Sequence, residues 1–358
     1  MPELLSLACA VPSRVLERAE TVALLPTLSG SDEAARRFRT AVDNTCIDRR
    51  HLAMSVPELM EKSGAARRAL LYESLAPDLA GDAVARALRE ADVPPGAVQT
   101  LVSVSCTGYA LPSVDTHVMA TVGMNRTARR IPITELGCSA GVAALGVAAD
   151  LLETHPGPAL VMSVELCSMC LQTTELTSSD VIGNILFADA AAATVLRPGD
   201  SGTGPQILAS HTVLLPDTRD LLGMRLTDTG LRLVLAPELP DAVHRLIPGA
   251  VEGFLAGRNL SLDSIDFWII HPGGPKILAA IGEGLRLSAS ALAPSWTAWR
   301  RYGNVSSATV FYIMDALREV AAPREGALGL MLAVGPGLSC ELVLIRAAGW
   351  LCRPVPGR

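Results

Sequence analysis

Apolar and polar positions follow two patterns along the chain, one typical of surface helices and one typical of buried strands. In SDEAARRFRTAV (residues 31–42) and LAGDAVARALREA (79–91), apolar residues recur at helical spacing and charged residues occupy the opposite face. In contrast, VQTLVSVSC (98–106) is a continuous run rich in valine that ends before a glycine-containing loop. The first hundred residues therefore predict surface helices followed by a buried strand.

A strand–helix–strand–strand pattern then occurs twice. The first copy consists of TLVSVSC (100–106), a helix starting at Cys138, ALVMSVE (159–165) and AAAATVLRP (190–198). The second consists of DFWIIHPGG (266–274), a helix in GNVSSATVFYIMDALREV (303–320), ALGLMLAVGPG (327–337) and LSCELVLIRA (338–347). Cys138 follows Cys106 by 32 positions and Asn304 follows His271 by 33, so the spacing nearly repeats. This predicts an α/β fold of two duplicated halves, residues 1–200 and 201–358, about a pseudo-twofold axis.

The helix predicted at CSAGVAALGVAA (138–149) is apolar on every side. Such a helix must be covered all round, which predicts central helices between sheets and a layered αβαβα arrangement. No uncharged apolar run reaches the ~18 residues that a membrane helix needs. The apolar N-terminus, MPELLSLACAVPS, carries Glu3 where a signal peptide has a basic region, so we expect a first strand and a soluble, cytoplasmic protein.

Composition and cysteine content narrow the class of protein. The 358 residues are 49% hydrophobic and 18% charged, with a net charge of −6, and no long basic run supports nucleic-acid binding. Eight scattered cysteines in a chain of this size indicate reduced thiols rather than a disulfide scaffold. Cys167 and Cys170 form a CxxC pair, but no second pair or nearby histidine completes a zinc site, so no metal is expected.

Three residues of the repeated pattern carry candidate chemistry. Cys138 opens an apolar helix, and a helix N-terminus with a neighbouring imidazolium would lower the thiol pKa for attack on a thioester. His271 ends a buried strand, Asn304 opens the second helix, and N–H groups of both types can form an oxyanion hole. Taken singly, each residue is better explained as core packing, a satisfied polar group or a helix cap. Together, in duplicated positions, they predict one active site.

Five ordered segments, GCSAGVAAL, ILFADAAAATV, HPGGPKIL, YGNVSSATV and AVGPGLSCE, resemble the type III polyketide synthases of the chalcone synthase superfamily. The resemblance covers nearly the whole chain and is strongest from Cys106 to Glu341. It implies a thiolase-type fold, a homodimer, and an acyltransferase that condenses malonyl-CoA, with loss of CO2, onto a starter bound to Cys138. His271 and Asn304 would stabilise the oxyanion and assist decarboxylation, and the chain would cyclise to an aromatic or pyrone product.

The same resemblance assigns residues to the cavity. Phe187 matches a gatekeeping phenylalanine between the CoA tunnel and the cavity, and Leu111 matches a loop position that lines the cavity of the second subunit. Cys106 and Cys170 match bacterial tetrahydroxynaphthalene synthases, which use malonyl units alone, whereas Met224 replaces an aromatic residue and admits a different starter. The other implied cavity positions are Leu233, Ser306 and the GPG loop of Gly335, Pro336 and Gly337.

The CoA phosphates need basic partners, and the resemblance implies which residues supply them. The family's basic cluster corresponds to Arg36, Arg37 and Arg39, although Thr40 and Asn44 replace basic residues there, for which Arg49 and Arg50 are candidates to compensate. Gly274 and Lys276, in HPGGPKIL, match positions beside the CoA. Malonyl-CoA and an acyl-CoA starter are the implied partners, with no metal, cofactor, carrier protein, nucleic acid or membrane.

Several alternatives are open at this point. A ketoacyl-carrier-protein synthase of the third kind shares the fold and triad, but it tends to carry an HQAN-like stretch where this chain has HPGG. A thiolase would need a second catalytic cysteine, and Cys340 is better explained as strand core. A non-catalytic or hydrolytic relative would usually lack a triad residue. Within the family, the choice lies between 1,3,6,8-tetrahydroxynaphthalene from malonyl-CoA alone and an alkylpyrone or alkylresorcinol from an acyl-CoA starter.

Overall fold

The computed structural model describes residues 1–61, 64–199, 202 and 204–350. The α-helices are α1 (Arg18–Ala23), α2 (Leu25–Ser29), α3 (Asp32–Thr45), α4 (Val56–Met60), α5 (Ala65–Glu90), α6 (Val114–Val122), α7 (Ala140–Thr154), α8 (Ser178–Leu186), α9 (Leu239–Ala256), α10 (Pro275–Gly284), α11 (Ala289–Tyr302) and α12 (Thr309–Val320). The 3₁₀ turns are η1 (Pro95–Ala97), η2 (Gly137–Ser139), η3 (Cys167–Cys170), η4 (Leu262–Ser264), η5 (Ser306–Ala308) and η6 (Pro336–Leu338). The strands are β1 (Pro2–Leu4), β2 (Ala8–Ala10), β3 (Arg14–Glu17), β4 (Arg49–Leu52), β5 (Thr100–Val104), β6 (Arg129–Ile133), β7 (Ala159–Leu166), β8 (Asp189–Pro198), β9 (Gln206–Leu214), β10 (Leu222–Thr227), β11 (Gly230–Leu235), β12 (Phe267–Ile270), β13 (Leu328–Gly335) and β14 (Ser339–Arg346).

The strand pairing confirms that the fold repeats. In the first copy β5 runs parallel to β7, and β7 runs antiparallel to β8. In the second copy β12 runs parallel to β13, and β13 runs antiparallel to β14. The predicted first strand is divided in two, and its first part, β1, joins the halves because it pairs with β8 and, through Glu3, with Gln206 of β9. The result is one continuous order, β12-β13-β14-β9-β1-β8-β7-β5-β6, with β2 on β8.

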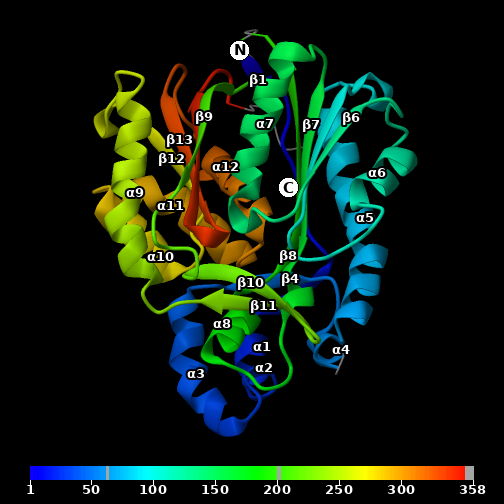
Figure 1. Cartoon of the computed structure of the whole chain (residues 1–358), viewed down its shortest axis with the longest axis vertical. Coiled ribbons are helices and arrows are strands. Elements are labelled where there is room, and N and C mark those ends of the chain that lie inside the picture. The colour runs from blue at the N-terminus through cyan, green and yellow to red at the C-terminus, as the bar shows by residue number, and fades with distance from the viewer. Residues whose placement is uncertain (62–63, 200–201, 203, 351–358) are drawn as a thin grey trace.

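The predicted layers are present (Figure 1). Helices α7 and α12 lie in the middle between the two groups of strands, α5 and α6 cover one outer side, and α9 and α10 cover the other. Gly137–Thr154, which is η2 followed by α7, is long and apolar enough to cross a membrane by length and composition. Of its residues 61% are buried between the sheets, so the described chain uses this segment as a core helix.

Two details at the helix starts differ from the prediction. Cys138 lies in η2, and α7 itself begins at Ala140. Asn304 does not open α12: it lies before η5, in an isolated parallel bridge with Phe187. Backbone hydrogen bonds from Asn304 N–H to the Leu186 carbonyl (2.9 Å) and from Ala188 N–H to the Asn304 carbonyl (2.9 Å) form this bridge. The position of Asn304 is therefore fixed by pairing with the segment at Phe187 and not by the start of a helix.

A hairpin that the sequence patterns did not identify lies below the layered body (Figure 1). Its strands, β10 and β11, pair with Met224 directly opposite Leu233. Cross-strand partners project from the same face of a hairpin, so these two candidate cavity residues act as neighbours. Arg232 of the hairpin donates hydrogen bonds to the buried Asp180 carboxylate, with a shortest distance of 2.7 Å, and ties the hairpin to α8.

Candidate active site

The turn that carries Cys138 is held by close glycine packing. Gly137 adopts a φ of 56°, and a Cβ built there would lie 2.5 Å from Cδ of Pro336. A Cβ on Gly335 would lie 2.3 Å from the Ser139 hydroxyl oxygen. Because any side chain at these positions would overlap its neighbours, the GPG loop can lie directly against the Cys138 turn. The loop at the end of β13 thereby sets the position of Cys138 in the other half.

His271 follows β12 and is almost completely buried, with 2% of its surface exposed. Its backbone N–H donates to the Leu332 carbonyl (2.9 Å), which extends the pairing of β12 with β13. Among the described residues neither ring nitrogen has a hydrogen-bond partner, and burial lowers the pKa of the imidazole to about 4. The ring is therefore neutral near pH 7, and an N–H group and a lone pair are available to a bound molecule.

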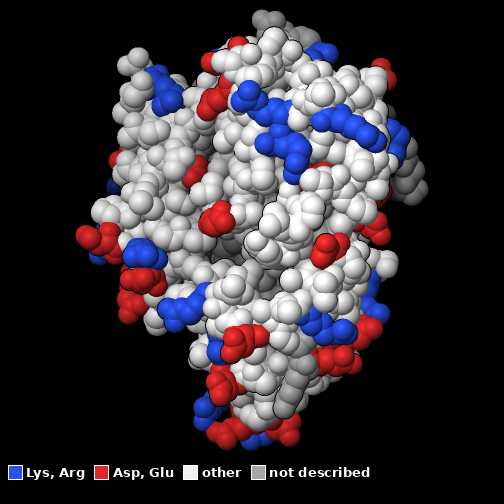
Figure 2. Space-filling view, turned by 45° about the vertical axis from the view of Figure 1, so that its right-hand side comes forward, with Lys and Arg blue, Asp and Glu red and all other residues white. Residues whose placement is uncertain are grey.

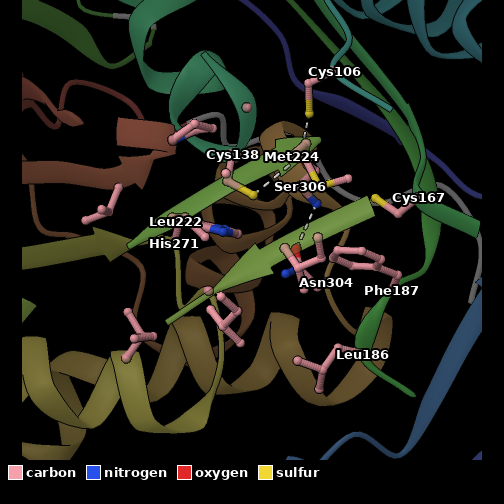
Figure 3. Close-up of a pocket in the computed structure, with 18 of the residues that line it drawn as sticks. Cys106, Cys138, Cys167, Leu186, Phe187, Leu222, Met224, His271, Asn304 and Ser306 are labelled. Carbon is pink, nitrogen blue, oxygen red and sulfur yellow. Dashed lines mark hydrogen bonds between the residues drawn. The ribbon is translucent and has the colours of Figure 1, made fainter. Parts of the chain in front are cut away.

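The side chain of Asn304 is oriented by its own loop. Its Oδ1 accepts a hydrogen bond from the backbone N–H of Ser306 (2.9 Å). With the carbonyl end of the amide used in this way, the NH₂ end is directed to the other side. Figure 3 shows Cys138, His271 and Asn304 projecting into one space from three separate segments. The structure thus brings together the three residues that sequence reasoning selected.

One cavity contains these side chains. Of the other predicted positions, Phe187, Cys106, Met224, Leu233, Ser306 and Pro336 line it. Most of the remaining wall is apolar and was not predicted, and it includes Ile182, Leu186, Leu222, Leu235, Leu239, Val243 and Val334. These residues come from ordinary core patterns of α8, α9, the hairpin and β13, and only the fold identifies them as a wall.

The environment of Cys138 differs from the expected one. Cys138 is half-buried, and the loss of water around its thiol raises the pKa to about 11, although a hydrogen bond with Ser306 acts in the opposite direction. A thiolate paired with an imidazolium is therefore not the resting state that these surroundings favour. The prediction of a lowered thiol pKa is wrong, because burial raises the pKa by more than the hydrogen bond with Ser306 lowers it.

A polar chain that the sequence analysis missed runs behind Cys138. Ser306 Oγ lies 3.5 Å from the sulfur of Cys138 and 3.1 Å from the sulfur of Cys106. The chain ends at Glu165, which accepts hydrogen bonds from the Cys106 backbone N–H (3.1 Å), from the Thr107 hydroxyl (2.7 Å) and from the Ser307 hydroxyl. Glu165 is fully buried, and burial raises the pKa of its carboxyl group. The signal available in the sequence was Glu165 itself, an acidic residue at the end of the predicted buried strand ALVMSVE.

Some predicted cavity positions lie elsewhere. Cys170 does not line the cavity: its sulfur contacts the Thr107 carbonyl oxygen at 3.7 Å, while Cys167 lines the cavity instead. Both cysteines belong to η3, the 3₁₀ turn that follows β7, and all four residues of this turn are buried. Gly335 and Gly337 act through the backbone and are not part of the wall. All seven described cysteines are free thiols, and Cys352 lies outside the described residues.

The residues predicted to contact CoA differ in their exposure and in their distance from the cavity wall. The side chains of Arg36, Arg37, Arg39 and Lys276 are exposed and lie outside the cavity wall, and Arg37 pairs with Glu33 at 2.6 Å. Gly274 caps the start of α10, while its neighbour Gly273 lines the cavity. Arg50 is the clear correction, because only 1% of it is exposed and it cannot reach a phosphate at the surface.

A second cavity adjoins the first. Both are lined by Cys106, Thr107, Gly137, Met224 and Pro336, so these residues form the junction. The second cavity continues past Arg68, Tyr72 and Met169 to Tyr109 and Leu111, which are 71% and 79% exposed. Leu111 thus lies in this second space and not at the Cys138 cavity of its own chain.

Comparison with known proteins identifies the family. Residues 2–200 match the description "Chalcone and stilbene synthases, N-terminal domain", and residues 206–349 match the corresponding C-terminal domain. The chain belongs to the chalcone and stilbene synthase family. A 1,3,6,8-tetrahydroxynaphthalene synthase of Streptomyces peucetius subsp. caesius is 38% identical over 335 residues, which cover 91% of this chain and 87% of the relative.

The solved structures agree with this family assignment. The crystal structure of 1,3,6,8-tetrahydroxynaphthalene synthase from Streptomyces coelicolor A3(2), a bacterial type III polyketide synthase, matches with a TM-score of 0.91 at 30% identity. The match covers 98% of this chain and 100% of that one. An alpha-pyrone synthesis polyketide synthase-like protein of Mycobacterium tuberculosis is 30% identical over 289 residues, 78% of this chain and 72% of the relative. The predicted thiolase-type fold and the acyltransferase class of a type III polyketide synthase are confirmed.

Proposed function

We propose that this polyketide synthase loads an acyl group from CoA onto Cys138 and extends it with malonyl-CoA, with His271 and Asn304 as the oxyanion donors. The observation that carries the proposal is the convergence of the three side chains in one largely apolar cavity. In loading, the Cys138 sulfur attacks the thioester carbon while its proton passes to the His271 imidazole. The CoA sulfur then leaves and takes that proton.

Extension uses His271 again, now as a hydrogen-bond donor together with Asn304. The bond between the malonyl carboxylate and its methylene carbon breaks, CO2 leaves, and the electron pair moves to the thioester oxygen to give an enolate. The His271 N–H and the Asn304 NH₂ donate hydrogen bonds to this oxygen in a dry cavity, where such bonds are strong. The enolate carbon then attacks the Cys138 thioester, so that a C–C bond forms and the Cys138 thiolate leaves. CoA thioesters are the only reactants this scheme requires.

For the product, we propose an aromatic compound of the tetrahydroxynaphthalene type made from malonyl-CoA alone, supported by the 38% identity to an enzyme of that name. A second candidate is an acyl-CoA starter whose chain enters the adjoining cavity past Met224. Mass spectrometry of products from malonyl-CoA alone, and then with a panel of acyl-CoA starters, distinguishes these two candidate products.

The matched variant Cys138→Ala tests the proposed nucleophile. It should fold and release no condensed product, and full activity in it would contradict the proposal.

We also propose that the enzyme works in the cytoplasm as a homodimer. Strand β6 is the outer strand of the sheet and pairs only with β5 among the described strands, which leaves one backbone edge free. The exposed Tyr109 and Leu111 line the same second cavity as Pro132 and Ile133 of β6. Figure 2 turns this side toward the viewer, and the middle of that face carries few charged side chains. Light scattering on wild type and on Leu111→Asp tests the dimer.

A further inference from the structure

Arg50 is one of the largest fully buried side chains of the described protein, with 1% of its surface exposed. Burial lowers its pKa to about 10, so the guanidinium is charged near pH 7. A buried charge is costly unless hydrogen bonds compensate for the lost water. The partners of Arg50 therefore indicate what the charge does.

Two of these partners are backbone carbonyls at the end of α8. Nη1 donates to the carbonyl oxygens of Asn184 (2.8 Å) and Phe187 (2.9 Å), and Nη2 donates to the Thr21 hydroxyl (3.3 Å). Phe187 is the C-cap residue of α8, and carbonyl groups at this end lack partners within the helix. A cation is also favoured at this end of a helix. Arg50 thus fixes the backbone of Phe187 directly.

The alkyl part of the same side chain contacts the loop that carries Asn304. A Cβ built on Gly303 would lie 3.1 and 3.3 Å from Cγ and Cδ of Arg50, and 2.9 Å from the Leu186 carbonyl oxygen. Gly303 also has a φ of 70°, so glycine is required there for two reasons. Arg50 therefore lies against both sides of the bridge between Phe187 and Asn304.

The segment is held at its other end by the residue that follows β4. The Asp189 carboxylate accepts hydrogen bonds from the backbone N–H groups of Ala53 (2.7 Å) and Ser168 (2.8 Å) and from the Ser168 hydroxyl (2.6 Å). Arg50 and Ala53 thus hold residues 187–189 at two points. This arrangement is more than helix capping, because it fixes the short backbone stretch that pairs with Asn304.

We propose that Arg50 is a positioning residue, which sets the positions of the Phe187 side chain and the neighbouring Asn304 amide in the cavity wall. The proposal rests on the proposed role of Asn304 in decarboxylation. A lysine would keep the charge but could not reproduce the planar arrangement of donors that reaches two carbonyls and a hydroxyl. In the proposed loading step only the Cys138 sulfur and the His271 imidazole take part, so losing this geometry should impair extension more than loading.

The test compares Arg50→Lys with Arg14→Lys, a control on the adjacent strand β3 whose side chain is exposed. We expect the Arg50→Lys variant to lose about tenfold to hundredfold in kcat for extension, because displacements near 1 Å can cost a hundredfold. KM and the rate of Cys138 acylation, followed by intact-protein mass spectrometry, should change by less than about threefold. Hydrogen exchange at the Ala188 and Asn304 amides should accelerate, and Arg14→Lys should match wild type in every measurement.

Two results would overturn the proposal. One is wild-type extension by Arg50→Lys, and the other is an equal loss of acylation and extension together with a lower melting temperature, which would indicate a structural role only. If Arg50→Lys fails to fold, Thr21→Val removes the longest of the three hydrogen bonds and should show the same selective loss, smaller in size. If wild type condenses no CoA ester, the proposed function fails, whereas amide exchange at Ala188 still decides whether Arg50 holds the bridge.

Discussion

Gly141 offers a direct test of how the two halves are joined at the active site. It lies at the start of α7, and a Cβ built there would be 2.2 Å from the Ser307 carbonyl oxygen and 3.0 Å from Cγ2 of Val310. Ser307 belongs to η5, the turn that also contains Ser306 and follows Asn304. Gly141→Ala would therefore force the Cys138 segment and the Asn304 segment apart.

The expected magnitude follows from two opposing effects. In a helix, glycine to alanine normally stabilises by ~1 kcal/mol, because alanine has the higher helix propensity. Here the new methyl group must move about 1 Å from a backbone carbonyl to reach ordinary contact distance, and overpacking of this kind costs ~1–3 kcal/mol. The net change is a loss of up to ~2 kcal/mol in the free energy of unfolding. A displacement near 1 Å between Cys138 and Asn304 should lower extension on the order of a hundredfold.

Gly249→Ala in α9 is the matched control, since a Cβ there meets no atom within 4 Å. Denaturant unfolding and the rate of product formation from CoA esters would be measured for both variants. We expect Gly249→Ala to gain stability by ~1 kcal/mol and to keep the wild-type rate. Equal stability gains in both variants, with equal rates, would refute the claim that contact at Gly141 sets the active-site geometry.

Two further predictions concern the cavity itself. The pKa of His271 is about 4 in the folded protein against 6.5 in an unfolded chain, so folding excludes a proton between these values and wild type should lose up to ~3 kcal/mol of stability as pH falls from about 6.5 to 4. His271→Asn should lack this loss, and parallel pH dependences of unfolding in the two proteins would contradict it. Cys167→Phe should shorten the products detected by mass spectrometry because Cys167 lines the cavity, whereas Cys170→Ala should leave their length unchanged; the reverse outcome would restore Cys170 to the wall.

Much of the fold could be predicted because it depends on periodicity. The repeated order of strands around a helix with no polar face is visible in the sequence. A helix of this kind must be covered on both sides, which predicts strands on either side of a central helical layer. The hairpin β10–β11 was missed because its residues are mostly half-buried and show neither a clear alternation nor a continuous apolar run. The bridge at Asn304 was missed because a single paired residue leaves no periodic pattern.

The candidate site could be predicted as far as side-chain chemistry allowed. Cys138, His271 and Asn304 were found because their chemistry is uncommon at duplicated positions. Arg50 was assigned to the surface because arginine is usually exposed, and only the fold reveals the carbonyls that compensate its burial. Cys170 was misplaced because the sequence does not show that β7 ends in a tight turn, which changes the direction of each following side chain.

Burial has opposite consequences for the two steps of the proposed reaction. It raises the pKa of the Cys138 thiol to about 11, which makes loading harder because little thiolate is present before substrate binds. It also keeps His271 neutral, and this favours extension. An imidazolium beside the enolate would be a strong acid and would transfer its proton to the new carbanion, whereas a neutral imidazole can donate a hydrogen bond without losing the proton. The largely apolar cavity is therefore better suited to stabilising the enolate than to activating the thiol, so loading is the step that depends most on a fall in the thiol pKa when substrate binds.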